Sequence, residues 1–302
     1  GVNDHDWATP DHEFVAGATL VPGGGYAVAG ETRGDPGRYL DLWVARLADD
    51  GELLWQQGYD GVGWDTGTDL VARPEGGLLA LGTTGASITS SNDAWVLDLD
   101  DDGAVLWERQ FGGPYDDRAS GLVLLPDGGL VVCGRRGRSP AVGDYEAWLV
   151  RLDEDGDLLW ERTYGGASSR SLSDVVALAD GGFAAAGHDG GDAWLVRLDT
   201  GGRILWTRTV TEPETGGTAS IVALPDGGFA VASWTESSGA WDRDAWVLRF
   251  DKWGRLACGP DAPCDVLTQA DCTDGDPCTT DDCAAGTGCL NESTGFSCDD
   301  GI

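Results

Sequence analysis

The side chains that could do chemistry in this chain are mainly carboxylates. Asp98, Asp100 and Asp102 spell the start of a D-x-D-x-D-G calcium loop, but Arg109 stands where an EF-hand loop needs its bidentate glutamate. The corresponding turns elsewhere in the chain read ADDG, DEDG and DTGG. A hairpin turn is therefore a better interpretation of this stretch than a calcium site.

Asp69 and Asp174 fall at equivalent positions of two strands that we expect at the centre of the fold. Such a pair can act as general acid and base in glycoside hydrolysis, or hold a cation. The alternative is that both are turn-proximal or water-bound acids. The sequence has no G-x-S-x-G, H-E-x-x-H or P-loop motif, and its three histidines lack the spacing of a zinc site. We therefore expect that the protein is not an enzyme.

The best binding candidates lie in or beside segments whose length varies between the repeats described below. Arg135, Arg136 and Arg138 form the only basic cluster of a very acidic chain. Trp234 and Trp241 fall outside the repeated tryptophan positions, so they could stack on a sugar, pack on a partner, or pack only within their own loop. The candidate binding residues are Arg135, Arg136, Arg138, Tyr145, His188, Trp234 and Trp241.

Cysteines divide the chain into two parts. Cys133 stands alone in a strand and is expected to be a small buried apolar residue. The other seven crowd into residues 258–298, which indicates a disulfide-held module in an oxidising compartment. Of these, Cys298 has no obvious partner. The candidate disulfide residues are Cys258 and Cys264, which could bridge each other, and Cys272, Cys278, Cys283 and Cys289, which allow three connectivities.

Acidic residues also gather in this cysteine-rich part. Asp271, Asp274 and Asp276 lie among glycines, and oxygen ligands of this kind could hold calcium in an extracellular module. The alternative is a solvated acidic loop. Calcium is thus the only cofactor that the sequence suggests, and it is not certain.

A repeat that fills most of the first 258 residues must position these side chains. Its first tryptophan recurs at Trp43, Trp95, Trp148, Trp194 and Trp246, with spacings of 52, 53, 46 and 52 residues. Within each unit apolar residues alternate with polar ones, and glycine-containing turns separate four short segments. Four strands in a unit of about 50 residues are typical of a β-propeller blade.

We therefore predict an all-β fold, a five-bladed β-propeller with four antiparallel strands per blade. The propeller spans 14–258, after a polar lead-in at 1–13 and before a disulfide-rich, loop-dominated tail at 259–302. The last blade would end in a shortened outer strand around Arg255–Cys258, and Val2–Trp7 is the candidate closing strand there.

Length variation is confined to the connections that leave one end of the predicted sheets, whereas the hairpin turns at the other end are short and repeated. Because function tends to lie on variable loops over a rigid scaffold, we expect the variable-loop face to bind a protein or glycan.

Charge limits the partners. The chain has 52 acidic and 19 basic residues, a net charge of −33, so repulsion opposes binding to nucleic acid or an anionic membrane. No apolar run is long enough to insert into a membrane. The chain contains no methionine and starts at Gly1, which a processed export signal would explain and a trimmed chain would equally produce.

Two resemblances support export. The repeats at 93–107, 146–160 and 192–206 approach the pattern D-A-W-x-x-R-L-D-x-x-G-x-x-x-W, which resembles a family of exported bacterial propeller repeats. The tail resembles the cysteine-rich CTDC repeat of slime-mould matrix proteins and secreted myxobacterial proteins. The residues that carry this second likeness are Asp276-Pro277-Cys278-Thr279, Asp281, Cys283 and Gly288-Cys289. Both resemblances imply an extracellular or cell-surface location and leave the ligand open.

Together these features indicate a non-enzymatic binding or scaffold protein of the cell exterior. The alternatives are a subunit of a self-assembling fibre and, more weakly, a propeller glycoside hydrolase that uses Asp69 and Asp174.

Overall fold

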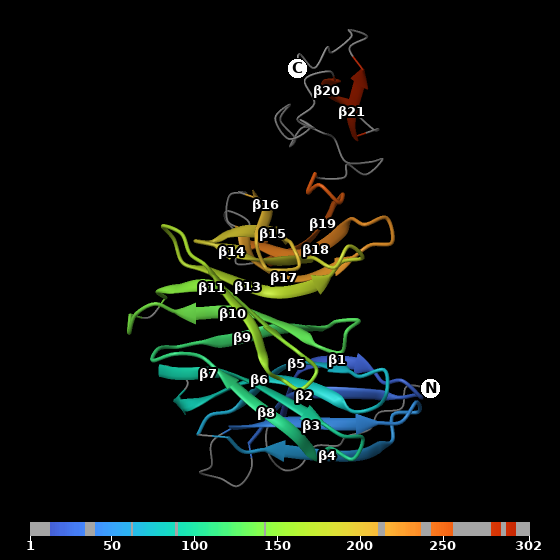
Figure 1. Ribbon diagram of the computed structural model, residues 1–302, viewed down its shortest axis with the longest axis vertical. Helices are drawn as coiled ribbons and strands as arrows, with labels where there is room; N and C mark the ends of the chain where they lie inside the picture. The colour runs from blue at the N-terminus through green and yellow to red at the C-terminus, as the bar shows by residue number, and fades with distance from the viewer. Residues whose placement is uncertain are drawn as a thin grey trace.

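Figure 1 shows the computed structural model of the chain. The structure describes residues 13–33, 40–61, 63–87, 90–141, 143–210, 215–236, 243–255, 279–284 and 288–293. Within these residues all regular structure is β-strand, and no helix that could span a membrane occurs there. The prediction of an all-β chain is confirmed.

Four sheets contain four antiparallel strands each, in the order of the chain. The first sheet consists of β1 (Glu13–Leu20), β2 (Tyr26–Arg33), β3 (Leu40–Leu47) and β4 (Leu53–Tyr59). The second consists of β5 (Thr66–Ala72), β6 (Leu78–Ser87), β7 (Ser90–Leu99) and β8 (Val105–Phe111). The third consists of β9 (Arg118–Leu124), β10 (Leu130–Gly137), β11 (Tyr145–Leu152) and β12 (Leu158–Tyr164). The fourth consists of β13 (Arg170–Ala177), β14 (Phe183–Asp189), β15 (Asp192–Leu198) and β16 (Ile204–Val210).

The fifth sheet has three strands within the described residues: β17 (Thr215–Ala223), β18 (Phe229–Glu236) and β19 (Arg243–Phe250). In the tail, β20 (Thr279–Ala284) and β21 (Gly288–Ser293) form a separate antiparallel hairpin. Each sheet therefore corresponds to one repeat, which is the architecture typical of a β-propeller.

Successive sheets stack face to face and bury the first tryptophan of each repeat. Trp95 packs with Leu42 and Val44 of the preceding sheet, and Trp148 and Trp194 occupy the same position in the next two interfaces. Trp148 and Trp194 are each 1% exposed. Burying side chains of this size contributes about 2–3 kcal/mol apiece, so these interfaces supply much of the stability.

The second tryptophan of each repeat packs on a hairpin turn of the following sheet. The turn residue is a glycine with positive φ, and an added Cβ there would lie 2.7–2.9 Å from the indole ring. Glycine is therefore needed both for the turn and for the close approach. The four pairs are Trp55–Gly103, Trp107–Gly156, Trp160–Gly202 and Trp206–Gly254.

Asp100 shows why the calcium-like stretch is a turn. Its Oδ1 accepts hydrogen bonds from the backbone N–H groups of Asp102 (3.0 Å) and Ala104 (2.8 Å). The same pair of bonds recurs at Asp153 in the next sheet. This carboxylate therefore fixes the β-hairpin, as the sequence indicates.

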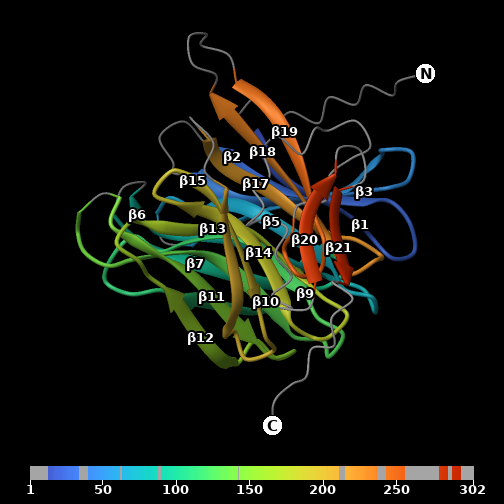
Figure 2. The same ribbon diagram turned by 90° about the horizontal axis from the view of Figure 1, so that it is seen from above.

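The first and fifth sheets are the two ends of the stack. Figure 1 shows β4 at its lower side and β18 and β19 at its upper side, and Figure 2 gives the same arrangement from above. Each sheet makes extensive contacts with the next, but among the described strands no comparable contact joins the fifth sheet to the first. The predicted closing strand Val2–Trp7 and Leu256–Cys258 lie outside the described residues.

Both ends of the stack leave apolar side chains in contact with solvent. Leu20 of the first sheet is 72% exposed and Val247 of the fifth is 70% exposed. The equivalents of Val247 in inner sheets, such as Leu195, are buried in the next interface. These two exposed faces matter for assembly.

Candidate functional site

Antiparallel topology gives the stack two different ends. The tight turns between the first and second and between the third and fourth strands of each sheet lie at one end, here named the turn end. The connections between the second and third strands, and those between sheets, lie at the other end, here named the connection end. The variable segments that the sequence singles out belong to the connection end.

Three of the predicted binding residues come together there. Arg135 lies near the end of β10, Tyr145 begins β11 and His188 lies near the end of β14. The Arg135 guanidinium carbon lies 4.8 Å from the centroid of the Tyr145 ring. The Tyr145 hydroxyl is 3.2 Å from His188 Nε2, and the two rings meet edge to face at 6.2 Å. Ser171 Oγ lies 3.0 Å from His188 Nδ1.

Asp116 completes this group, which is named the Arg135 cluster: Asp116, Arg135, Tyr145, Ser171 and His188. Its carboxylate accepts a hydrogen bond from Arg135 at 3.1 Å. The cluster joins the third and fourth sheets, because Ser171 and His188 belong to the fourth. Its side chains are therefore held by two sheets rather than by a loop.

The charges of the Arg135 cluster are set by its neighbours. Burial raises the pKa of Asp116, but hydrogen bonds from Asn92 and Arg118 and the nearby Arg135 charge outweigh burial and bring the pKa below its usual value. Burial and the Arg135 charge lower the pKa of His188. At neutral pH the site thus presents a carboxylate, a guanidinium and a neutral imidazole.

Arg136 and Arg138 point to separate partners. Arg136 is ion-paired with Glu161 and lies over the Trp148 ring at 5.9 Å. Arg138 is 2.7 Å from Asp144. The side chains of all three arginines are 29–32% exposed, and each has its own acidic partner. The basic cluster of the sequence is therefore a row of partly exposed ion pairs.

Sequence reasoning missed Asp116, Ser171 and Arg118. They lie at the start of the inner strands or just before them, outside the connections whose length varies between repeats. A usable signal was present, because residues 116–118 read Asp-Asp-Arg directly before a strand.

The remaining predicted residues are more dispersed. Trp234 lies on β18 and is partly buried. Trp241, the candidate calcium ligands Asp271, Asp274 and Asp276, and Cys258, Cys264, Cys272 and Cys278 lie outside the described residues. Cys283 and Cys289 are directly opposite each other in the β20–β21 hairpin.

Asp69 and Asp174 hold neighbouring sheets together. Asp69 Oδ1 accepts the N–H of Leu70 (2.8 Å) and its Oδ2 accepts that of Leu122 in the third sheet (3.0 Å). Asp174 makes the equivalent bond to Ile221 of the fifth sheet at 2.9 Å. Burial, with a smaller contribution from the Asp174 charge, raises the pKa of Asp69 to about 6. The hydrogen bonds assign both carboxylates a strand-joining role.

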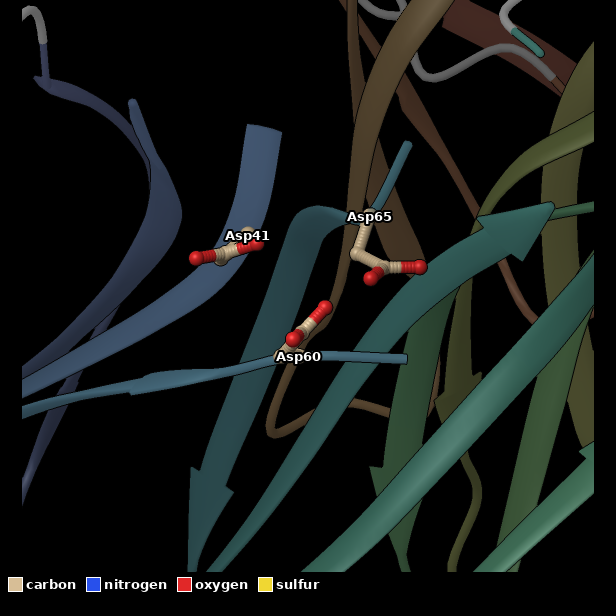
Figure 3. A group of neighbouring side chains, drawn as sticks. All are labelled: Asp41, Asp60 and Asp65. Carbon is tan, nitrogen blue, oxygen red and sulfur yellow. The ribbon is translucent and has the colours of Figure 1, made fainter. Parts of the chain in front are cut away.

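Three carboxylates form a second polar group that the sequence analysis did not identify. Asp41 on β3 approaches Asp60 and Asp65, which flank the connection from β4 to β5, with one oxygen of each within 4.8 Å of the others (Figure 3). Asp65 is fully buried and accepts the N–H of Gly61 at 2.6 Å. Hard oxygen ligands of this kind suit calcium, although acidic groups also gather without an ion.

This architecture is similar to that of known proteins. Residues 41–237 match the family described as outer membrane protein assembly factor BamB, PQQ_2. The WD40 domain of Neurospora crassa Pan2 is similar with a TM-score of 0.50 at 12% identity, covering 85% of this chain and 74% of that one. PQQ-bound aldose sugar dehydrogenase from Streptomyces coelicolor gives a TM-score of 0.46 at 14% identity, covering 78% and 80%. No curated protein matches the sequence.

The family match covers more than half of the chain and includes strands of all five sheets. At 12% identity the Pan2 domain shows a shared fold alone. The repeat, the four-stranded antiparallel sheets and the matched residues agree. This chain therefore belongs to the BamB-type (PQQ_2) family of β-propeller repeat proteins.

Proposed function

We propose that this protein is a non-enzymatic binding or scaffold protein of the cell exterior whose connection end receives a protein or glycan. The single observation that carries the proposal is the Arg135 cluster. Arg135, Tyr145 and His188 are oriented by contacts with one another and with two sheets. Side chains held in this way lose little conformational entropy when a partner binds.

The chemistry of the Arg135 cluster suits a polar partner. Arg135 supplies a guanidinium stacked on an aromatic ring, while Tyr145, Ser171 and neutral His188 supply hydrogen-bond donors and acceptors. Tyrosine and arginine are also the residue types that contribute most to protein interfaces.

The wider setting is part of the same proposal. The five sheets are five blades, and the cysteine-rich tail, which we expect to be disulfide-bonded and able to bind calcium, displays or anchors the propeller outside the cell. The cysteine density and the two sequence resemblances support that location.

The test begins with a glycan array and purified exported proteins as probes, followed by calorimetry of the best ligand. We expect Arg135→Ala to weaken binding at least tenfold and Tyr145→Phe to weaken it several-fold. Arg162→Ala is the matched control, because Arg162 also lies over an aromatic ring, that of Trp160, but on an outer strand. Equal affinity of Arg135→Ala and the wild type would place the ligand elsewhere.

Self-assembly into a fibre is the second candidate, favoured by the exposed apolar faces of the first and fifth sheets. Large exposed apolar patches mark interaction surfaces. Light scattering and negative-stain electron microscopy of the full chain, with calcium and then a chelator, should reveal oligomers that Val247→Ser weakens. A monodisperse monomer under both conditions would contradict this candidate.

Glycoside hydrolysis receives no support from the geometry. Each oxygen of Asp69 and Asp174 already accepts at least one hydrogen bond from the protein.

A further inference from the structure

One hairpin turn at the turn end differs from its equivalents. In the first three sheets the turn between the last two strands is acidic: 48–52 reads ADDGE, 100–104 reads DDDGA and 153–157 reads DEDGD. In the fifth sheet residues 251–255 read DKWGR. Trp253 thus stands where the first three sheets have an aspartate, and cations stand on both sides of it.

Trp253 is a large apolar side chain on the surface. It is 56% exposed, whereas the tryptophans of the repeat positions in the inner sheets are buried or half-buried. Lys252 Nζ lies 4.3 Å from the Trp253 ring centroid, and the Arg255 guanidinium carbon lies 5.4 Å from it. The three side chains form one exposed aromatic and cationic surface, named here the Trp253 turn.

The two cations of the Trp253 turn make no ion pair with an acid in the part of the chain that the structure describes. Arg135, Arg136 and Arg138 at the connection end all have acidic partners. Lys252 and Arg255 therefore remain available to an external carboxylate.

The backbone of the Trp253 turn is fixed. Asp251 Oδ1 accepts the N–H groups of Trp253 and Arg255, both at 2.9 Å. Gly254 packs against the Trp206 ring of the fourth sheet, and Arg208 Nε donates to its carbonyl at 3.2 Å. The exposed side chains project from a rigid base, which lowers the entropic cost of binding.

The chemistry of the surface selects its partner. Two unpaired cations call for carboxylates, and tryptophan and arginine are enriched at the energetic centres of protein interfaces. Because the Trp253 ring already carries two cations, its faces are less available for stacking on a sugar. These observations favour an acidic polypeptide over a glycan.

We infer that the Trp253 turn is a second interaction surface, which binds an acidic polypeptide segment. It lies at the opposite end of the stack from the Arg135 cluster, so the inference does not depend on the proposed function. At about 0.15 M salt charges are screened over roughly 8 Å, which weakens repulsion by the rest of the acidic chain while the close contacts persist.

The test uses a fluorescein-labelled decaglutamate peptide and fluorescence anisotropy of the full chain at physiological ionic strength. The decisive variant combines Lys252→Glu, Trp253→Asp and Arg255→Asp, which gives the fifth sheet the turn sequence of the third. That sequence already folds in the third sheet, with Asp153 making the same hydrogen bonds. We expect the wild type to bind and the triple variant to bind at least tenfold more weakly.

Arg203→Asp is the matched control, because Arg203 is an exposed cation on the neighbouring turn without an adjacent exposed tryptophan. It should bind within about twofold of the wild type. Lys252→Gln alone should weaken binding several-fold and covers the case in which the triple variant does not fold. The inference is overturned if decaglutamate does not bind the wild type, or if it binds the triple variant and Lys252→Gln as tightly as the wild type. Tighter binding of oligogalacturonate through the same residues would also overturn it, in favour of a glycan.

Discussion

Two neighbouring junctions between sheets use the same repeat positions but balance their charges differently. Asp93 and Asp117 meet at the junction of the second and third sheets, and Asp41 and Asp65, 52 residues earlier, occupy the equivalent places between the first and second. Beside Asp93 and Asp117 lies the guanidinium of Arg136. The earlier junction has no arginine at that position.

Thr84 is the residue equivalent to Arg136, and Asp60 is equivalent to Gly112. The first junction therefore gains a third carboxylate and lacks the guanidinium. At the second junction burial raises the pKa of Asp117 above its usual value, and the backbone hydrogen bonds from Gly137 and Gly113 and the Arg136 charge offset only part of this rise. The comparison shows that the repeat preserves the backbone while exchanging the charges that it buries.

The two junctions also differ at their centres, where the second has a polar contact that the first lacks. Asp69 of the second sheet holds the Leu122 N–H of the third, whereas Gly17 of the first sheet, equivalent to Asp69, packs without a side chain against Asp69 itself. The second junction is therefore joined by a carboxylate at its centre and by a guanidinium at its edge, and the first by neither.

The largest effect is expected from Asp69→Asn, which removes the central carboxylate. The new side-chain amide keeps one hydrogen-bond acceptor, but it places an N–H donor against one of the two backbone N–H groups that Asp69 binds. We expect this change to lower the free energy of unfolding by about 2 kcal/mol at pH 4. The folded pKa is raised to about 6, so between about pH 4 and 6 the folded state holds a proton that the unfolded state has lost. The wild type therefore loses stability as pH rises through this window, and the difference from the variant shrinks.

Urea unfolding at several pH values from 4 to 7 measures this difference. Asp102→Asn, on an exposed turn, serves as the control and should follow the wild-type pH dependence. If Asp69→Asn and the wild type differ by the same amount at pH 4 and pH 7, the ionisation of Asp69 is not coupled to folding.

Arg136→Thr should come next, because it gives the second junction the residue of the first. Asp93 and Asp117 lose their neighbouring positive charge and Glu161 loses its ion pair. After allowance for partial exposure we expect a loss of about 2 kcal/mol. Thermal unfolding should show this as a Tm several degrees lower.

Arg138→Thr is the matched control, because its pair with Asp144 has similar exposure and no buried carboxylate beside it. Solvent screens such a pair, so its removal should change the stability little. Equal losses in the two variants would mean that Arg136 acts only through an ordinary surface ion pair.

Much of the fold was predictable because its determinants are local or strictly periodic. Tryptophan spacing and the glycine turns locate the strands, and alternation of apolar residues gives their buried faces. Closure of the five sheets into a ring could not be predicted in this way, because closure depends on the rotation accumulated over every interface between sheets. Leu20 and Val247, exposed at the two ends, show no distinctive local sequence pattern.

The Arg135 cluster was predictable in part for the same reason. Arg135, Tyr145 and His188 were found because they lie in or beside variable segments. Asp116, just before β9, and Ser171, on β13 opposite His188, lie outside those segments. The ion pair of Arg136 with Glu161 joins two strands of the third sheet that are 25 residues apart in the chain, so the local sequence around Arg136 does not reveal it. Aligning the repeats with one another would have revealed the exchange of Arg136 for Thr84, since the offset is constant.

The smallest effect is expected at the first junction, from Asp60→Asn. This change removes one of three neighbouring carboxylates without altering side-chain size, so it should raise the Tm by about 1 °C at low ionic strength. Because Asp60 is exposed, 0.5 M NaCl should screen the repulsion and abolish the gain. Asp50→Asn, on an exposed turn, controls for a general effect of reduced net charge. A lower Tm for Asp60→Asn at both salt concentrations would contradict repulsion among the three. If calcium raises the wild-type Tm and Asp60→Asn removes that rise, a bound cation occupies the place that Arg136 fills at the second junction.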